Sequence, residues 1–251
     1  MNVKRNINRP TRIEEKINMT TLRNILTILI IGLTFPAFGQ IDTVFIQKDS
    51  LLGTAQSIFF DNNKNSNFYD KINYWGFLRF DNESYTYSID FLKENNLTLN
   101  KKIPVISQTK WVTLEQYKGT FYAYHPCDFY THYRISINDT TFIDWTGEGP
   151  VASKIIDQKK INNKTYDFKL TGVFKEDRNL IIHIIDSENG IAVFEETKGA
   201  TNQSYYYLMI ASGKIRNVPL IVNNCEIQKE LELRFDEPNY NKLLKRKWQK
   251  R

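Results

Sequence analysis

The chain has 251 residues, of which 34 are basic and 28 are acidic, so its formal net charge is +6. The positive excess lies at the two ends, because residues 1–39 hold six basic and two acidic residues and the last ten hold six basic residues and no acidic one. The part between them, residues 40–241, has 22 basic and 26 acidic residues, and this mildly acidic body excludes the basic stripe expected of a nucleic-acid-binding protein.

Residues 1–39 have the pattern of a secretory signal peptide with an extended basic n-region. Arg23 precedes an uncharged apolar run over residues 25–35, and small residues follow at Ala37 and Gly39. This order predicts export to the periplasm or the medium, with cleavage near Gly39-Gln40. The run is shorter than the about 20 apolar residues that cross a bilayer comfortably. An uncleaved anchor and a buried hydrophobic helix are the alternatives.

The stretch from Tyr166 to Val222 predicts an antiparallel meander, because short breaks rich in Gly, Asn, Asp and Ser separate runs of β-forming residues. An aromatic content of 14% supports an all-β class, and residues 40–237 have a suitable length for one such domain. The predicted strands of the meander are Tyr166–Phe174, Asn179–Ile185, Ile191–Thr197, Ser204–Ala211 and Lys214–Val222.

Further strands are expected on both sides of the meander, together with a few short helices. Trp75–Phe80 and Ser84–Ile89 are expected to form a hairpin, and Thr113–Gln116 matches a capping box that predicts a brief helix. Phe91–Asn95 is a second short helical turn. The other predicted strands are Asp42–Gln47, Gln56–Phe60, Tyr133–Asn138, Thr140–Trp145, Val151–Asp157 and Glu230–Asp236.

These elements favour either an antiparallel meander barrel or a two-sheet sandwich. The architecture resembles that of lipocalin-like proteins, in which up-and-down barrels hold a small ligand. Their Gly-x-Trp signature near the first strand is not evident, because Trp75-Gly76 has the reverse order. The resemblance therefore concerns the fold and does not fix the function.

Residues 238–251 are expected to form a basic C-terminal helix. Tyr240, Leu243, Leu244 and Trp248 fall on one face at helical spacing, and the opposite face is basic. A helix that packs on the surface of the domain is the first interpretation. Peripheral contact with a membrane or with an anionic partner is the alternative.

Two cysteines, Cys127 and Cys225, are the only ones in the chain. In an exported protein an even number suggests a disulfide, which would stabilise the fold by up to about 4–5 kcal/mol because it closes a long loop. Two buried thiols that never meet remain the alternative.

The residues between Gly119 and Trp145 are the most aromatic part of the chain and give the candidate ligand-binding set. Aromatic rows on strands are more often core, but tyrosine brings a hydroxyl that needs a partner, so a surface that faces a small apolar or sugar ligand is the second interpretation. The candidate residues are Tyr122, Tyr124, Phe129, His132, Tyr133, Arg134 and Trp145.

His125, Cys127, Asp128 and His132 are residue types that bind metal, but their expected geometry argues against one site. If Pro126-Cys127 is the tip of a hairpin, the two imidazoles lie about 13 Å apart along the strands. We therefore assign no metal, no cofactor and no catalytic residue.

Two pairings keep an exported hydrolase as the alternative function. His125 or His132 could act with Asp128, and Asp144 with Glu148 would supply two carboxylates beside Trp145. Because the motifs of known catalytic families are missing, the sequence favours a binding protein, whose partner is a small apolar or glycan ligand or another protein.

Overall fold

The computed structural model describes residues 44–49, 56–128, 131–173, 175–198, 203–225 and 232–245. The chain divides into two units, Met1–Asp42 and Thr43–Arg251, and all of the described residues belong to the second unit. The predicted signal peptide at 1–39 and its cleavage position lie outside the described residues.

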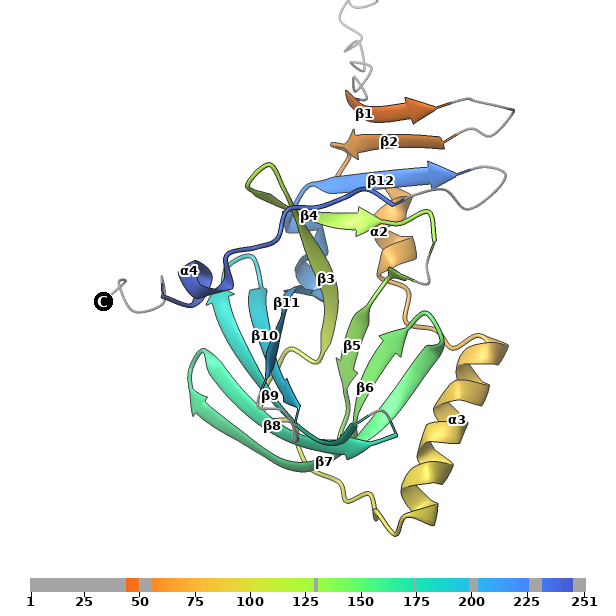
Figure 1. The fold of residues 1–251 in the computed structure, drawn as a ribbon, viewed down its shortest axis with the longest axis vertical. Coiled ribbons are helices and arrows are strands. Elements are labelled where there is room, and N and C mark those ends of the chain that lie inside the picture. Colours follow the sequence, from red (N-terminus) through yellow and green to blue (C-terminus); the bar gives the residue numbers. More distant parts are fainter. Residues whose placement is uncertain are drawn as a thin grey trace, which may run out of the picture. The chain divides into compact units, whose positions relative to one another are not determined.

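Eight of the strands in the described residues close into an antiparallel barrel (Figure 1). Strand β3 closes it, because β3 pairs with both β5 and β11. The predicted all-β class is confirmed, and of the two predicted architectures the structure has the barrel. In order around the barrel the strands are β3 (Lys110–Tyr117), β5 (Arg134–Ile137), β6 (Thr141–Thr146), β7 (Gly149–Asn162), β8 (Thr165–Gly172), β9 (Lys175–Asp186), β10 (Ile191–Lys198) and β11 (Ser204–Ala211).

A second group of strands extends the sheet beyond the barrel. Residues 114–117 of β3 pair with β4, and β12 then lies parallel to β4. The disulfide between Cys127 and Cys225 joins the chain just after β4 to the end of β12, so the predicted pairing is confirmed. The strands of this extension, beyond β3, are β4 (Thr120–His125), β12 (Leu220–Cys225), β2 (Gln56–Asp61) and β1 (Val44–Asp49).

Four of the five strands predicted for the meander are present as β8, β9, β10 and β11, each antiparallel to the next. The prediction for Lys214–Val222 is wrong in two respects: its first half is not a strand, and its second half does not pair with β11. A 3-10 helix, η3 (Ser212–Asn217), follows β11, and the chain then enters β12, which pairs with β2 and β4. The helical turn buries Ile215 and turns the chain out of the barrel wall into the extension.

The predicted hairpin at Trp75–Phe80 and Ser84–Ile89 is wrong, because residues 79–94 form the helix α3 (Arg79–Glu94). The Asp81 carboxylate accepts a hydrogen bond of 2.9 Å from the Leu78 backbone N–H and so caps the first turn. Ser88 and Leu92 are buried four residues apart, which is the spacing of one helical face. The expected short turn at Phe91–Asn95 is the end of the same helix.

Helix α3 packs against β7 (Figure 1). Gly149, which begins β7, allows this approach: its φ of +97° is a left-handed conformation, and a Cβ there would lie 2.8 Å from the Ser84 Cβ. The Ser88 hydroxyl accepts a hydrogen bond of 2.9 Å from the Ala152 N–H, so α3 also takes up a backbone donor of the barrel wall.

Three other local predictions are wrong. Thr113–Gln116 belongs to β3 and forms no helix, because the barrel and its extension take up both edges of this strand. Pro126-Cys127 is not the tip of a hairpin, since the neighbours of β4 are β3 and β12. In the described part of Glu230–Asp236, only an isolated bridge between Gln116 and Asp236 is formed.

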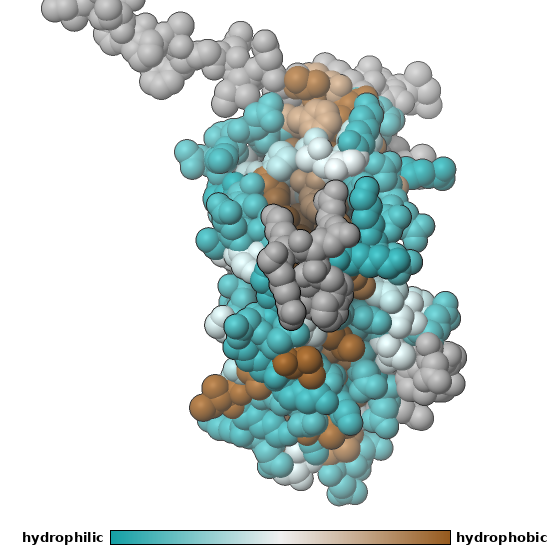
Figure 2. All heavy atoms as spheres, turned by 90° about the vertical axis from the view of Figure 1, so that its left-hand side faces the viewer, coloured by the Kyte–Doolittle hydropathy of each residue, from teal (hydrophilic) through white to brown (hydrophobic). Residues whose placement is uncertain are grey.

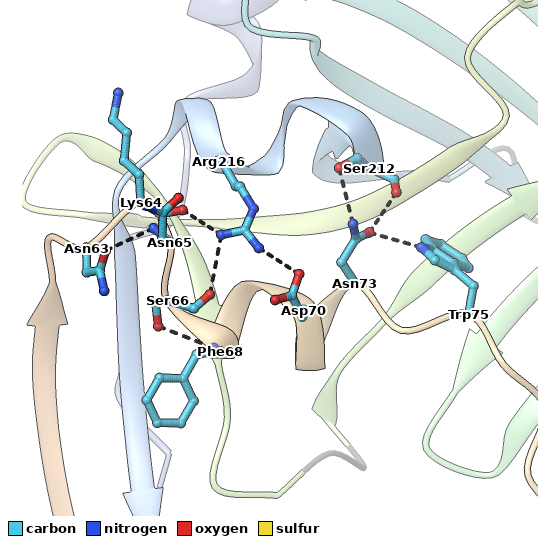
Figure 3. A network of polar contacts seen from close by, with 10 residues as sticks. All are labelled: Asn63, Lys64, Asn65, Ser66, Phe68, Asp70, Asn73, Trp75, Ser212 and Arg216. Atoms are coloured by element: carbon cyan, nitrogen blue, oxygen red, sulfur yellow. Dashed lines mark hydrogen bonds and ion pairs between the residues drawn. The ribbon is translucent and has the colours of Figure 1, made fainter.

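The helix α2 (Asn67–Ile72) is fixed to η3 by a network of polar contacts (Figure 3). The Arg216 guanidinium donates to the backbone oxygens of Lys64 (2.5 Å) and Ser66 (3.4 Å), and it forms an ion pair of 2.6 Å with Asp70. One side chain of η3 therefore fixes the start of α2, while Tyr69 and Ile72 are buried beneath the helix.

A second part of this network continues past α2. The Asn73 Oδ1 accepts hydrogen bonds from the Ser212 hydroxyl (2.6 Å) and from the Trp75 indole N–H (2.9 Å), as Figure 3 shows. Trp75 is thereby held in one orientation beside the barrel.

The C-terminal helix α4 (Tyr240–Lys245) covers part of the outside of the barrel. Tyr240, Leu243 and Leu244 pack against a cluster of buried residues that includes Leu208 and Ile210 of β11. A helix that packs on the surface of the domain, as predicted, is therefore present at residues 240–245. Trp248 lies outside the described residues. On the face shown in Figure 2, described residues are mostly hydrophilic; hydrophobic ones gather in the upper part of the view, and smaller groups lie below.

Candidate functional site

The inside of the barrel has a filled half and a hollow half. In the filled half, Trp111 and Phe194 meet edge to face at 5.3 Å, and Phe142 and Phe168 pack at 6.3 Å. In the hollow half there is a cavity of about 380 Å³. The residues that line it are Thr113, Tyr133, Asp144, Thr146, Ser153, Arg178 and Tyr207.

Strand alternation explains why these residues share one level of the barrel. On β6, Phe142, Asp144 and Thr146 are two residues apart, and the first lies in the filled half while the others line the cavity. On β9, Arg178 likewise precedes the buried residues Leu180 and Ile182. On both strands the inward face therefore changes from apolar to polar, and the contact between Asp144 and Arg178 places the two changes at one level of the barrel.

A buried ion cluster forms one wall of the cavity. The Arg178 Nη1 donates to the Asp144 carboxylate at 3.2 Å and to the Glu196 carboxylate at 2.9 Å, and its Nη2 donates to the other oxygen of Asp144. The exposed fractions of the three side chains are 3%, 8% and 1% for Arg178, Asp144 and Glu196. The guanidinium also lies 5.1 Å above the Phe142 ring, at the boundary of the filled half.

Two tyrosine hydroxyls complete this cluster. The Tyr133 hydroxyl donates to the Asp144 carboxylate, and the Tyr207 hydroxyl pairs with Glu196. Burial, together with the nearby carboxylates, raises the pKa of both tyrosines well above the ordinary value, so both stay neutral donors. Burial alone would lower the pKa of Arg178, but Asp144, Tyr133 and Glu196 outweigh it and hold the guanidinium charged.

The remaining lining hydroxyls are also bonded to the protein. Thr113 donates to the Tyr133 carbonyl at 2.7 Å, and Thr146 donates to the Gly149 carbonyl at 3.0 Å. Ser153 lies 3.5 Å from the Arg178 Nη2 and accepts from it. The polar groups of the cavity are thus fixed in position before any ligand enters, which lowers the entropic cost of binding.

Of the predicted binding residues, Tyr133 lines the cavity. Arg134, which begins β5, and Trp145 on β6 lie on the outer side of the barrel wall. The Arg134 guanidinium lies 5.1 Å from the Trp75 ring and 4.8 Å from the Trp145 ring, and it donates to the Tyr74 carbonyl. Burial lowers the pKa of Arg134 to about 10, although Asp81 opposes the shift. These residues form a cation–π stack that attaches the α2–α3 connection to the barrel.

Tyr122 and Tyr124 belong to the sheet extension and do not line the cavity. Tyr122 packs against Phe60 at 5.4 Å, and the Tyr124 hydroxyl donates to the Glu232 carboxylate. Burial and the contact with Glu232 raise the pKa of Tyr124 above its ordinary value. Phe129, the remaining aromatic candidate, lies outside the described residues.

The two candidate histidines are buried against α2. The His132 Nε2 lies 2.8 Å from the Ile72 carbonyl, and the His125 ring packs on Phe68 at 4.8 Å. Burial lowers the pKa of each histidine to about 4, so both imidazoles are neutral at pH 7. Among the described residues, no group of three or more His, Cys, Asp or Glu side chains is placed to hold a metal ion.

Asp144 and Glu148, one of the two pairs proposed for the hydrolase alternative, do not share a pocket. Asp144 lies inside the barrel and is paired with Arg178, whereas Glu148 is exposed on the turn between β6 and β7 and does not line the cavity.

Several residues of the cavity were missed by the sequence analysis. The predicted strands Tyr166–Phe174 and Asn179–Ile185 leave Arg178 in the break between them, whereas β9 begins at Lys175 and carries Arg178 inside the barrel. Glu196 carried a usable signal, because it falls on the same strand face as Ala192 and Phe194 and a charged residue on an apolar face needs a buried partner. The other missed lining residues are Thr113, Thr146, Ser153 and Tyr207.

Comparison of the chain with protein-family models, with curated proteins and with solved structures gives no match in any of the three. None of the helices in the described part of the chain has the length and hydrophobicity needed to cross a bilayer.

Proposed function

We propose that this protein binds a small ligand in the barrel cavity. The observation that carries the proposal is a hollow of about 380 Å³ beside a buried, fully paired Arg178–Asp144–Glu196 cluster. Its volume falls within the range of about 300–1,000 Å³ that is typical of ligand pockets, and apolar walls with a few fixed polar groups are the usual lining of such pockets. A barrel with a purely structural role would be expected to fill both halves with side chains.

The shape of the interior favours a compact ligand over a long acyl chain. A lipid tail would have to extend along the barrel axis, but Trp111, Phe142 and Phe194 fill the apolar half and are almost completely buried. The rings of Tyr133 and Tyr207, whose centroids lie 5.7 Å apart, offer flat surfaces for a ring-shaped ligand in the other half. We therefore expect a molecule about the size of a single ring with polar substituents.

Native mass spectrometry and calorimetry of the full chain test this proposal against monosaccharides, small aromatic compounds and fatty acids. A ring-sized compound should bind, and Thr113→Leu should weaken its binding about tenfold or more, because the added carbon atoms occupy the cavity. Thr120→Leu is the matched control, since Thr120 is exposed on the β3–β4 hairpin. The proposal would be contradicted if neither a monosaccharide nor a small aromatic compound binds, or if the Thr113→Leu variant binds the compound equally well.

We also propose that the protein is exported. The signal-like pattern of residues 1–39 and the disulfide between Cys127 and Cys225 support this location, because disulfides persist mainly in oxidising compartments. Expression of the full chain followed by mass analysis of the periplasm and the medium tests it. A mature N-terminus near Gln40 is expected, and recovery of the intact chain in the cytosol would contradict it.

A further inference from the structure

Most of the hydroxyl groups that line the cavity already donate a hydrogen bond to another group of the protein. The hydroxyl protons of Thr113 and Thr146 are directed to backbone carbonyls, and that of Tyr133 is directed to Asp144. The Tyr207 hydroxyl is committed to Glu196. A hydroxyl has one proton and two lone pairs, so what these groups still offer to a ligand is acceptor capacity.

The charged groups add to the same imbalance. The terminal nitrogens of Arg178 already donate to Asp144, Glu196 and Ser153, so they are not offered to an incoming anion. Asp144 lines the cavity, and the one cation that contacts it among the described residues is Arg178, which it shares with Glu196. A carboxylate has about four lone-pair sites, and Asp144 uses three of them for Tyr133 and Arg178.

The aromatic part of the wall is suited to the same kind of ligand. The rings of Tyr133 and Tyr207 pack against each other with centroids 5.7 Å apart at an angle of 46°, and both residues line the cavity next to Asp144. The face of a tyrosine ring attracts a cation, and this attraction is stronger where water is excluded. A carboxylate and two aromatic faces together match the requirements of an ammonium group, which has three donors and no acceptor.

We propose that the ligand of the barrel cavity carries a protonated amine, which binds between Asp144, Tyr133 and Tyr207. This inference rests on the proposed function and narrows it to one class of ligand, a compact organic cation with a ring. A carboxylate ligand of the same shape is disfavoured, because Asp144 repels it and the terminal nitrogens of Arg178 already donate to Asp144, Glu196 and Ser153. A neutral alcohol fits the space, but its single donor can bond to fewer of the acceptors on Asp144 and the lining hydroxyls than an ammonium group can.

The test uses three probes of similar shape that differ in charge: 2-phenylethylamine, 2-phenylethanol and phenylacetate. Each is titrated into the unaltered full chain at pH 7 by calorimetry, and glucosamine against glucose repeats the comparison on a sugar ring. The amine of each set should bind about tenfold or more tightly than its neutral counterpart, because a desolvated charge pair is worth more than a neutral hydrogen bond. Phenylacetate should bind most weakly.

Variants locate the effect. Asp144→Asn should reduce the amine affinity about tenfold while leaving the alcohol affinity within about threefold. Tyr207→Leu should also weaken the amine more than the alcohol, and it does so without removing a charge. Glu148→Gln is the matched control, because it removes a carboxylate from an exposed turn outside the cavity.

The two proposals fail in different ways. If the alcohol, the sugar or phenylacetate binds as tightly as its amine, the cavity binds ligands but the amine inference is wrong. If the amine preference is retained in both the Asp144→Asn and Tyr207→Leu variants, the amine binds elsewhere and the inference is again wrong. If no probe binds, the proposed ligand-binding function itself is contradicted.

Discussion

Arg178 on β9 and Asp144 on β6 form a two-pronged ion pair inside the barrel, although β7 and β8 lie between their strands in the wall. The pair thus links positions 34 residues apart in the sequence and fixes one side of the cavity. Removing two charges from water is costly, and their attraction repays this cost only when the geometry is good and the other donors are satisfied. Glu196, Tyr133 and Ser153 provide those further contacts.

Replacement of Arg178 by methionine should destabilise the protein by about 3–5 kcal/mol, because two buried carboxylates lose their cation. Equilibrium unfolding in urea measures the change. The triple variant Arg178→Met, Asp144→Asn, Glu196→Gln should recover most of the loss, since an uncharged cluster leaves no buried charge unpaired. A single variant as stable as the unaltered chain would show that the carboxylates are solvated by water in the cavity.

Acid should destabilise the fold partly through His132. Burial lowers its pKa to about 4 in the folded state, against the ordinary 6.5. The contribution of the neutral imidazole is therefore fully present above pH 6.5 and is lost as the pH falls from 6.5 through 4, because the unfolded chain binds the proton first. The total is about 3 kcal/mol.

The variant His132→Gln tests this contribution, because it keeps a side-chain N–H donor for the Ile72 carbonyl but does not titrate. Its free energy of unfolding should fall less steeply between pH 6.5 and 4 than that of the unaltered chain. His125, whose pKa is also about 4, should account for a further part of the slope. An unchanged slope in the double variant His125→Gln, His132→Gln would contradict the assignment to these two histidines.

Glu115 on β3 should have the opposite pH dependence. Burial raises its pKa from 4.5 to about 7, so the folded state favours the protonated carboxyl. Its contribution is present below pH 4.5 and is lost as the pH rises through 7. Above that range Glu115→Gln should stabilise the protein by about 2 kcal/mol, a value reduced for partial exposure. The difference between the two chains should shrink at pH 4, and a difference that does not depend on pH would exclude a titration effect.

Short-range patterns were sufficient for the centre of the barrel but not for its surroundings. Strands β8 to β11 follow one another with tight turns, so alternation and turn residues fix both their identity and their neighbours. The helix α3 was missed because its apolar residues read as alternating, whereas its burial has helical spacing at Ser88 and Leu92. The place of β12 beside β4 depends on a contact between distant segments, which periodicity does not encode.

The candidate site was predicted only in part, for a related reason. Tyr133 was named because aromatic residues gather near it, but the same criterion also selected Tyr122, Tyr124 and Trp145, which pack elsewhere. The cavity is defined instead by inward polar residues on separate strands, among them Arg178 and Glu196. Their partnership follows from the closure of the barrel, which brings β6, β9 and β10 to one level.

The disulfide between Cys127 and Cys225 should stabilise the sheet extension, and its removal tests this directly. The two cysteines are 98 residues apart, so in the chain-entropy model the bond contributes up to about 4–5 kcal/mol by restricting the unfolded state. A reducing agent should lower the melting temperature of the unaltered chain and should leave that of the Cys127→Ser, Cys225→Ser variant unchanged.

Because the disulfide joins the chain after β4 to the end of β12, outside the barrel, any binding of the ligand proposed for the cavity should persist in the reduced protein below the melting temperature. Loss of binding on reduction alone would show that the extension and the cavity are coupled.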